Sequence, residues 1–170
     1  LWMQATPWQH QTFPGKRPTI YRAEKKMGRD ALAAHASRSM SVMRQRVRIE
    51  SNDLRALKFS WLAEVGLSGS DISQRDLDDA KLRIVLSFEG DRSKFSAKNR
   101  MLSDLAQTLT GEELPYATLM YVWCSTRRTG EIITNPRTDR IRKIVVQSGE
   151  RQLGQWLDFE RDIRADFLAA

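Results

Sequence analysis

The residues best suited to bind a ligand lie close together in the last third of the chain. Trp123 offers an aromatic plane, and Arg127 and Arg128 follow it with planar guanidinium donors. Asn135 and Arg137 add an amide and a further guanidinium a few residues later. Ring stacking combined with bidentate hydrogen bonds suits sugar hydroxyls or the carboxylates of acidic sugars. We therefore treat these five residues as a candidate ligand-binding set.

A second candidate site consists of aspartates that precede a predicted strand and could offer oxygen ligands to calcium: Asp71, Asp76, Asp78 and Asp79. Their spacing fits no EF-hand loop, which needs alternating acids, a central glycine and a terminal glutamate. Asp78 and Asp79 are the candidate metal ligands, in a structural rather than a catalytic role. The alternative is that these two side chains cap the strand and pair with arginines such as Arg75 or Arg83.

Three arginines, Arg44, Arg46 and Arg48, alternate along a predicted strand from Ser39 to Glu50. In an extended chain their side chains fall on one side, about 6.6 Å apart. One interpretation is an exposed edge strand that charge protects from aggregation. The other is a surface that contacts anions, including nucleic acid. The net charge of +7 suits a polyanion, but bases and acids are interspersed elsewhere, which favours a solvated surface.

The sequence shows no signature of catalysis. His10 and His35 are its two histidines, and neither lies in a recognisable serine or cysteine motif. A glycine-rich phosphate loop and a dinucleotide fingerprint are both missing. A triad assembled from distant positions stays open, but we expect the protein not to be an enzyme. Cys124 is the single cysteine, so no disulfide can form within the chain.

Three segments predict the strands of the core. Leu57–Ala63 and Leu82–Phe88 alternate apolar with mostly polar residues, which indicates strands with one buried face. Ala117–Cys124 is apolar on both faces and is expected to lie deep inside the fold. Trp123 shares a face of this strand with other large side chains, so it suits the core as well as it suits a ligand.

Other segments predict a hairpin and two helices. Met27-Gly28-Arg29-Asp30 is a turn signal between two strand-like arms. A helix is predicted at Ser96–Leu109 from apolar residues at helical spacing, with its apolar face packed on the sheets. A second helix is predicted at about Phe159–Ala169, although the segment before it is also compatible with a strand.

Composition indicates one globular domain. The chain is 41% hydrophobic and 29% charged, as is usual for a folded protein. No apolar run approaches the roughly 20 residues that a membrane span requires. Residues 1–18 are predicted to be an extended N-terminal lead-in, and residues 19–170 a single domain.

Several stretches carry a family resemblance: FPGKRPTIY, LKFSWLAEV, DDAKLRIVLSFEGDRSKFS, GEELPYATLMYVW, NPRTDRIRKIVVQSG and LGQWLDFERDIRADF. In this order they resemble a bacterial domain-of-unknown-function family (number 3047), over about residues 13–169. Its members look like periplasmic or secreted proteins, similar to galactose-binding and carbohydrate-binding modules. The resemblance implies a mainly β fold, a jelly-roll-like antiparallel β-sandwich with two helices.

Two departures from the family pattern affect these expectations. The pattern has an acid where this chain has Cys124, so a polar role is not expected at that position. The pattern also continues beyond Ala170, which implies that this chain lacks the last strands of the sandwich. A signal peptide is not visible in the sequence, and the expected periplasmic or secreted location rests on the resemblance alone.

The expected function is therefore a non-catalytic glycan-binding module, or one associated with the cell envelope, without a cofactor. Its ligand would be a polysaccharide or envelope glycan at Trp123, Arg127, Arg128, Asn135 and Arg137. The alternative is a structural domain with a protein partner. Nucleic-acid binding through the three alternating arginines is less favoured.

Overall fold

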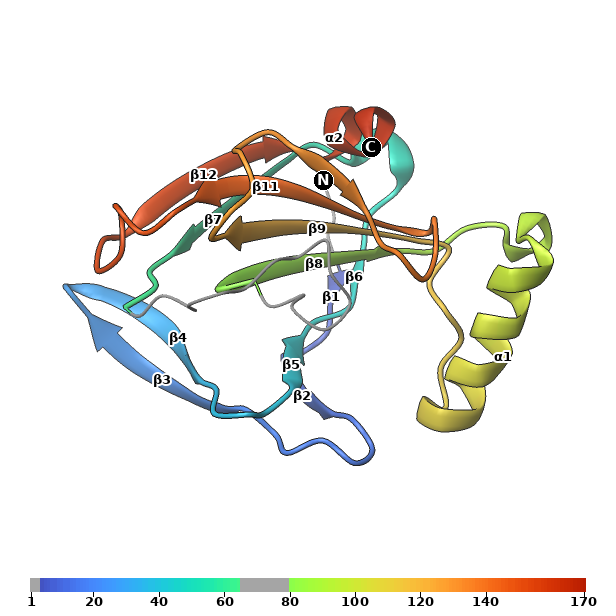
Figure 1. Ribbon diagram of the computed structural model, residues 1–170, viewed down its shortest axis with the longest axis horizontal. Helices are drawn as coiled ribbons and strands as arrows, with labels where there is room; N and C mark the ends of the chain where they lie inside the picture. The colour runs from blue at the N-terminus through green and yellow to red at the C-terminus, as the bar shows by residue number, and fades with distance from the viewer. Residues whose placement is uncertain (1–3, 65–79) are drawn as a thin grey trace. The chain divides into compact units, whose positions relative to one another are not determined.

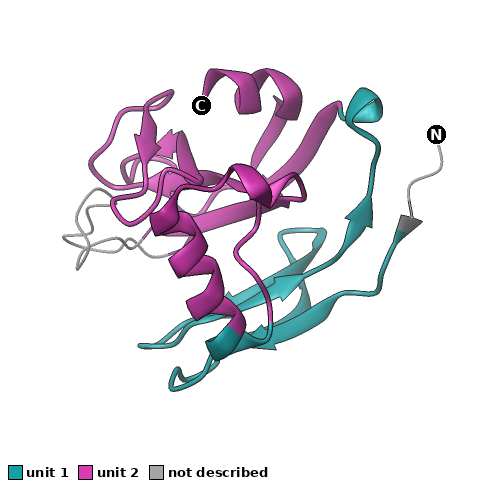
Figure 2. Cartoon of the chain, turned by 90° about the vertical axis from the view of Figure 1, so that its right-hand side faces the viewer, with its two compact units in different colours: residues 1–54, 108–111 teal, residues 55–107, 112–170 magenta. Residues whose placement is uncertain are grey.

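The computed structural model describes residues 4–64 and 80–170 of the chain, which falls into two compact units. Unit 1 comprises residues 1–54 and 108–111, and unit 2 comprises residues 55–107 and 112–170 (Figure 2). The division after residue 54 falls inside the single domain that the sequence predicted from residue 19 onward. Across the described residues, every helix is too short or too polar to cross a membrane.

The strands of unit 1 are β1 (Gln4–Ala5), β2 (Gln9–Thr12), β3 (Ile20–Lys26), β4 (Arg29–His35), β5 (Ser41–Arg44) and β6 (Val47–Arg48), followed by the 3-10 helix η1 (Ser51–Asp53). The elements that follow along the chain are β7 (Ala56–Trp61), β8 (Leu82–Phe88), the 3-10 helix η2 (Arg92–Lys94), α1 (Ala97–Thr110), β9 (Ala117–Cys124), β10 (Ile132–Thr134), β11 (Ile141–Ser148), β12 (Leu157–Asp162) and α2 (Ile163–Ala169).

Unit 1 contains three antiparallel strand pairs: β1 with β6, β2 with β5, and β3 with β4. The predicted hairpin is confirmed, and its turn places Met27 at φ 49° and Gly28 at φ 80°. Two successive residues with positive φ are typical of the tight turns that join right-twisted strands. The single strand predicted at Ser39–Glu50 is wrong, because Gln45 and Arg46 separate β5 from β6.

Unit 2 is built on a four-stranded sheet with the strand order β10-β11-β9-β8, and β12 pairs with β7. Figure 1 shows β11, β9 and β8 side by side. The mainly β class, the sandwich and the two helices are confirmed. The sheet is mixed rather than wholly antiparallel, because β11 runs parallel to β9. The chain leaves β9, forms β10 beyond the position of β11, and then returns as β11 between them.

The predicted alternation of side chains fills the core of unit 2. Trp61, Tyr121 and Trp123 are buried in one cluster, and Phe59 packs against them from β7. The rings of Phe59 and Tyr121 stack at 5.8 Å, and those of Trp61 and Trp123 lie 6.2 Å apart. The opposite face of β9 carries a second cluster that contains Val122 and Cys124. Both faces of β9 are therefore buried, as its sequence predicted.

Helix α1 is confirmed, but its buried face is not the predicted apolar one. Asn99 and Ser103 are its buried residues, whereas Met101 and Leu105 are exposed. The Ser103 hydroxyl accepts a hydrogen bond from the Leu114 amide at 3.2 Å. The buried face of α1 is polar because Asn99 and Ser103 form hydrogen bonds with polar groups of loops outside the helix.

Helix α2 begins at Ile163 rather than near Phe159, which lies on β12. The Asp162 side chain accepts a hydrogen bond from the Ala165 amide and so caps the helix. Within α2, the Asp166 carboxylate accepts hydrogen bonds from the buried Tyr121 hydroxyl at 2.8 Å and from Arg161. Burial, and then the bond to Asp166, raise the pKa of the Tyr121 hydroxyl.

Candidate ligand-binding site at one edge of the central sheet

The parallel pair brings the carboxyl ends of β9 and β11 to one edge of the sheet, where Cys124 lies opposite Ser148. The segment 125–131 leaves β9 at this edge and passes the end of β11 on its way to β10. The Gly149 amide donates to the Cys124 carbonyl at 2.9 Å, and the Ser148 hydroxyl donates to the Arg127 carbonyl at 2.5 Å. These bonds fix the segment against the end of β11.

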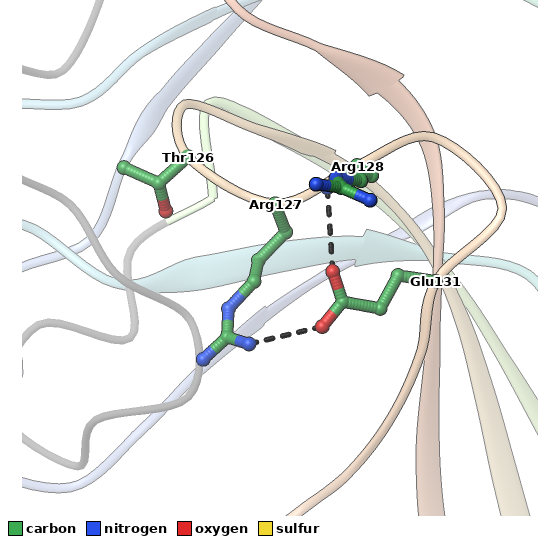
Figure 3. A pocket seen from close by; sticks show the side chains of 4 residues that line it. All are labelled: Thr126, Arg127, Arg128 and Glu131. Atoms are coloured by element: carbon green, nitrogen blue, oxygen red, sulfur yellow. Dashed lines mark hydrogen bonds and ion pairs between the residues drawn. The ribbon is translucent and has the colours of Figure 1, made fainter.

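Four residues of this segment line an open hollow of about 700 Å³: Thr126, Arg127, Arg128 and Glu131 (Figure 3). We name it the edge hollow. Arg127 Nη1 lies 2.9 Å from Glu131 Oε1, and the Arg128 backbone amide donates to Glu131 Oε2 at 3.3 Å. The Glu131 carboxylate is therefore held at both oxygens, between a guanidinium and a main-chain N–H (Figure 3).

The edge hollow combines hydrogen-bond donors with an acceptor. A guanidinium carries five N–H donors in a planar fork, and each carboxylate oxygen accepts more than one bond. Arg127 and Glu131 are half-buried, with about a third of each side chain exposed, whereas Arg128 is exposed. In the part of the chain that the structure describes, no acidic side chain pairs with the Arg128 guanidinium. The hollow thus has a positive excess that a bound anion would neutralise.

A buried lysine supports the same edge from the start of β8. The Lys81 side chain is only 1% exposed, and its Nζ donates to the Ser125 hydroxyl at 2.6 Å. Glu150 lies 3.5 Å from the same Nζ and balances its charge. The Lys81 amide also donates to the Trp123 carbonyl at 3.0 Å. Lys81 therefore holds Ser125, the residue next to Thr126, in place. We assign this buried charged side chain a positioning role.

The structure places Trp123 in the core rather than beside the arginines. Its side chain is fully buried, and its Nε1 donates to the Gly149 carbonyl at 2.8 Å. No face of the ring is open to a sugar in this arrangement. Of the two interpretations of Trp123, the position of the side chain agrees with the core one, which the alternation along β9 supported.

Asn135 and Arg137 lie at the other end of β10 from the edge hollow. The strand between them and Glu131 spans about 10 Å of extended chain. Asn135 Oδ1 accepts a hydrogen bond from the Arg137 amide at 2.8 Å, which closes a local turn. Of the five predicted residues, the structure therefore places only Arg127 and Arg128 at the edge hollow.

The turn after β10 belongs to a closed polar network. Asn99 of α1 donates to Asp139 Oδ1 at 2.7 Å and accepts from the Thr138 hydroxyl at 2.8 Å. The bond from Asn99, assisted by the nearby Arg140 and Arg142, holds the pKa of the Asp139 carboxyl below its usual value. The buried amide and hydroxyl of this network are thereby satisfied within the protein.

Aromatic rings close the same end of the sheet. The Arg140 guanidinium lies 5.4 Å from the centre of the Phe95 ring and 5.3 Å from that of Tyr116. Tyr116 in turn packs on Gly90 so closely that a Cβ there would overlap its ring. Cation–π contacts of this kind fix a side chain without offering it to a ligand.

The other sequence-predicted candidates are distributed as follows. Asp78 and Asp79 lie outside the residues that the structure describes, and so do Asp71 and Asp76. Among residues 4–64 and 80–170, no three histidine, cysteine or acidic side chains gather as metal ligands would. Buried Cys124 accepts a hydrogen bond from the Arg127 amide at 3.4 Å.

The three alternating arginines of unit 1 do not form one continuous ladder. Arg44 pairs in register with Gln9 of β2, whereas Arg48 pairs with Gln4 of β1. Arg46 falls in the break, where its amide donates to the Thr6 hydroxyl at 3.0 Å. The even spacing on which the anion-contacting interpretation depended is interrupted by this break.

His10 has a serine neighbour that its sequence context did not suggest. His10 Nε2 lies 2.8 Å from the Ser41 hydroxyl. That hydroxyl also accepts the Thr19 amide at 2.8 Å and is buried. Because His10 and Ser41 lie on paired strands, this bond is a cross-strand contact that fixes β2 against β5.

Sequence reasoning missed Thr126, Glu131 and Lys81 as members of this edge. For Glu131 a signal was available, because it follows Arg127 by four residues across a turn that contains Gly130. Lys81 has no such signal, since Ser125 and Glu150 are distant in sequence and only the sheet brings them to it.

Comparison with known proteins gives one result at the level of the family. No curated protein and no solved structure matches the chain. A family model described as "Protein of unknown function (DUF3047)" matches residues 6–170, which is nearly the whole chain. The protein therefore belongs to the DUF3047 family.

Proposed function

We propose that unit 2 is a non-catalytic module that binds an acidic glycan at the edge hollow. The observation that carries the proposal is the Arg127–Glu131 pair beside the exposed Arg128. Vicinal sugar hydroxyls need donors and acceptors side by side, and a sugar carboxylate needs a guanidinium. The hollow supplies both kinds of group, and Thr126 adds a hydroxyl.

Two features favour an acidic over a neutral glycan. Trp123 is buried, so the stacking platform expected for a neutral sugar is not offered at this edge. The two arginines also outnumber the one glutamate that lines the hollow. Electrostatic attraction to a carboxylate therefore replaces aromatic stacking as the main source of affinity in this proposal.

The hydrogen bonds of Glu131 favour a binding role over a catalytic one. It is the one carboxylate among the four residues that line the hollow, and both of its oxygens are engaged. Hydrolysis of a glycosidic bond usually needs a pair of carboxyl groups on either side of the bond. Among the described residues, the lining of the edge hollow does not supply such a pair.

We further propose that the glycan belongs to a bacterial cell envelope and that the protein is periplasmic or secreted. This part rests on the sequence resemblance to periplasmic and secreted proteins. The competing function is a structural domain that contacts a protein, for which the edge hollow would be irrelevant.

Calorimetric titration with oligogalacturonate tests the site. Maltooligosaccharide of the same length is the neutral comparison. We expect the acidic ligand to bind with micromolar to millimolar affinity, about −4 to −8 kcal/mol, because the hollow is shallow. Arg128→Gln is expected to weaken binding at least tenfold, since it removes the exposed guanidinium but keeps the backbone amide that holds Glu131.

Arg137→Gln is the matched control, because Arg137 is an exposed arginine at the other end of β10. It should bind like the unmodified protein. Binding that is lost in Arg137→Gln but kept in Arg128→Gln would contradict the proposal, because it would place the site at the other end of β10. Absence of binding to any acidic polysaccharide, with a protein partner captured equally by both variants, would favour the structural function.

A further inference from the structure

Strand β3 of unit 1 has an open edge. In the part of the chain that the structure describes, β4 is its one strand partner, so the two form a two-stranded sheet (Figure 1). Residues 22–25 of β3 are all exposed, so both faces of the strand reach solvent there. A row of unpaired N–H and C=O groups is a template for a further strand, and strand addition is a common mode of recognition.

The register of the hairpin shows which backbone groups this edge presents. Lys26 pairs with Arg29 across a two-residue turn, and the residues that flank such a turn exchange both of their backbone bonds. These exchanges recur at every second residue of an antiparallel pair, so they fall at the even-numbered positions of β3. The N–H and C=O groups of Tyr21, Ala23 and Lys25 therefore point away from β4, toward the open edge.

The side chains along β3 are complementary to those of a second copy of the same strand. When the strand is reversed about Ala23, Arg22 lies opposite Glu24 of the copy, and Glu24 lies opposite Arg22 of the copy. Opposite charges on directly facing residues stabilise an antiparallel pair. Ala23 meets its own copy at the axis, where its small side chain causes no clash. A twofold axis requires a self-complementary surface of this kind.

The charges also select one register and one edge of the hairpin. Moving the axis by one residue would place Arg22 against its own copy or Glu24 against its own copy, and like charges directly opposite are destabilising. Strand β4 offers no equivalent pairing. Its reversal about the central Leu32 brings Asp30, the single acid of that strand, opposite Ala34 rather than a base. The complementary edge is therefore that of β3.

We propose that β3 pairs with β3 of a second copy of this chain, antiparallel about a twofold axis at Ala23. The product is a continuous four-stranded sheet in the order β4-β3-β3-β4. The strand has 7 residues, and a strand pair of this length buries less than the about 800 Å² per partner of a standard complex. The dimer is therefore weak, with a dissociation constant on the order of 100 μM. This proposal is independent of the glycan site.

Sedimentation equilibrium over a concentration series tests the dimer and its register. The unmodified protein should pass from monomer to dimer as its concentration rises. Arg22→Glu and Glu24→Arg should each weaken the association at least about tenfold, because each places like charges opposite one another. The double variant should restore the dimer, because each changed residue again faces an opposite charge.

Arg151→Glu is the control, because it makes the same change of charge as Arg22→Glu at an exposed position of unit 2. It should leave the association unchanged. A protein that stays monomeric throughout the concentration series overturns the proposal. A double variant that associates no better than the two single variants overturns it as well.

Amide hydrogen exchange identifies the edge that pairs. As the protein is concentrated, exchange should slow at the amides of Tyr21, Ala23 and Lys25, whose N–H groups bond to the copy. The Leu32 amide points to the outer edge of β4, because Leu32 pairs with Ala23 in the hairpin, and its exchange rate should not change. Slowing at Leu32 but not at Ala23 would place the contact on β4 and contradict the proposal.

A cysteine at the axis gives an independent readout. Ala23→Cys should form a disulfide-linked dimer on oxidation, because the Cα atoms of a hydrogen-bonded pair lie about 5.5 Å apart, within the range of a disulfide. Leu32→Cys is the matched control, since it lies opposite Ala23 on β4 and its copy is three strand spacings away, roughly 14 Å. The native Cys124 is fully buried and does not compete. Equal cross-linking of the two variants would contradict the pairing at Ala23.

Discussion

Both ends of β10 carry arginines and acids, but the two ends hold them in different ways. Before the strand, Arg127 and Glu131 pair beside the exposed Arg128 and line the edge hollow. After it, the turn bonds to Asn99 of α1, and Arg140 lies over two aromatic rings. We call these the open end and the closed end of β10.

The difference shows that charged residues near one another do not by themselves mark a binding site. At the closed end, the hydrogen-bonding groups of Asn99 and Thr138 are used to attach α1 to the sheet. At the open end, one guanidinium is left to solvent beside a hollow. The closed end should therefore control stability, and the open end should control binding.

The largest effect on stability is expected at Trp123, which the sequence assigned to the ligand site and the structure places in the core. Trp123→Ala removes a fully buried ring and the bond to Gly149. We expect the free energy of unfolding to fall by about 3–5 kcal/mol, as for other large core side chains. Urea denaturation measures it. A stably folded Trp123→Ala protein with altered glycan binding would show that Trp123 takes part in ligand binding after all.

A smaller loss of stability is expected at the closed end. Asn99→Ala removes two hydrogen bonds and leaves the buried Thr138 hydroxyl without its acceptor. We expect the free energy of unfolding to fall by about 2–3 kcal/mol. Lys98→Ala, an exposed position on the same helix, is the control and should change it by less than about 0.5 kcal/mol. Equal effects of the two substitutions would show that Asn99 does not anchor α1.

The closed end should also show a particular dependence on pH. The folded pKa of Asp139 lies below its ordinary value of 3.8, chiefly because of the bond from Asn99. Its stabilisation is therefore fully present above the unfolded pKa and is lost as the pH falls through the folded pKa. The stability difference between the unmodified protein and Asn99→Ala should narrow below about pH 4.

Carboxyl titration by NMR spectroscopy checks the cause of this pH dependence. In Asn99→Ala the pKa of Asp139 should rise. The pKa of Asp91, which is lowered by its bond from Ser93, should stay where it is. If neither pKa moves, the hydrogen bond from Asn99 is not what stabilises the Asp139 carboxylate.

At the open end, the effect on stability should be the smallest. Arg128 is exposed, and its guanidinium anchors no other described residue, so Arg128→Gln should change the free energy of unfolding by less than about 0.5 kcal/mol. A large loss of stability on urea denaturation would mean that the open end is structural, like the closed one.

The strands of the core were predictable because their pattern is local. Leu82–Phe88 alternates, and Ala117–Cys124 is apolar throughout, so both strands follow from side-chain period alone. The parallel pairing of β9 with β11 was not predictable in this way. It depends on the chain passing the position of β11 before it returns, and no residue in segment 125–131 signals that path.

The candidate site was predictable only in part for the same reason. Arg127 and Arg128 are neighbours in sequence, so they had to lie together. Asn135 and Arg137 are also close in sequence, but β10 carries them to the opposite end of the sheet. The buried face of α1 was missed because the partners of Asn99 lie 39 and 40 residues away, at Thr138 and Asp139.

The comparison of the two ends is tested most directly by mapping ligand contacts residue by residue. Backbone amide shifts would be followed by NMR spectroscopy while oligogalacturonate is added to the full chain. We predict saturable shifts at Thr126, Arg127, Arg128 and Glu131, with the Arg128 amide that bonds to Glu131 among the most affected, and none at Asn135–Asp139. Shifts confined to Asn135–Asp139, or none at either end, would contradict the account.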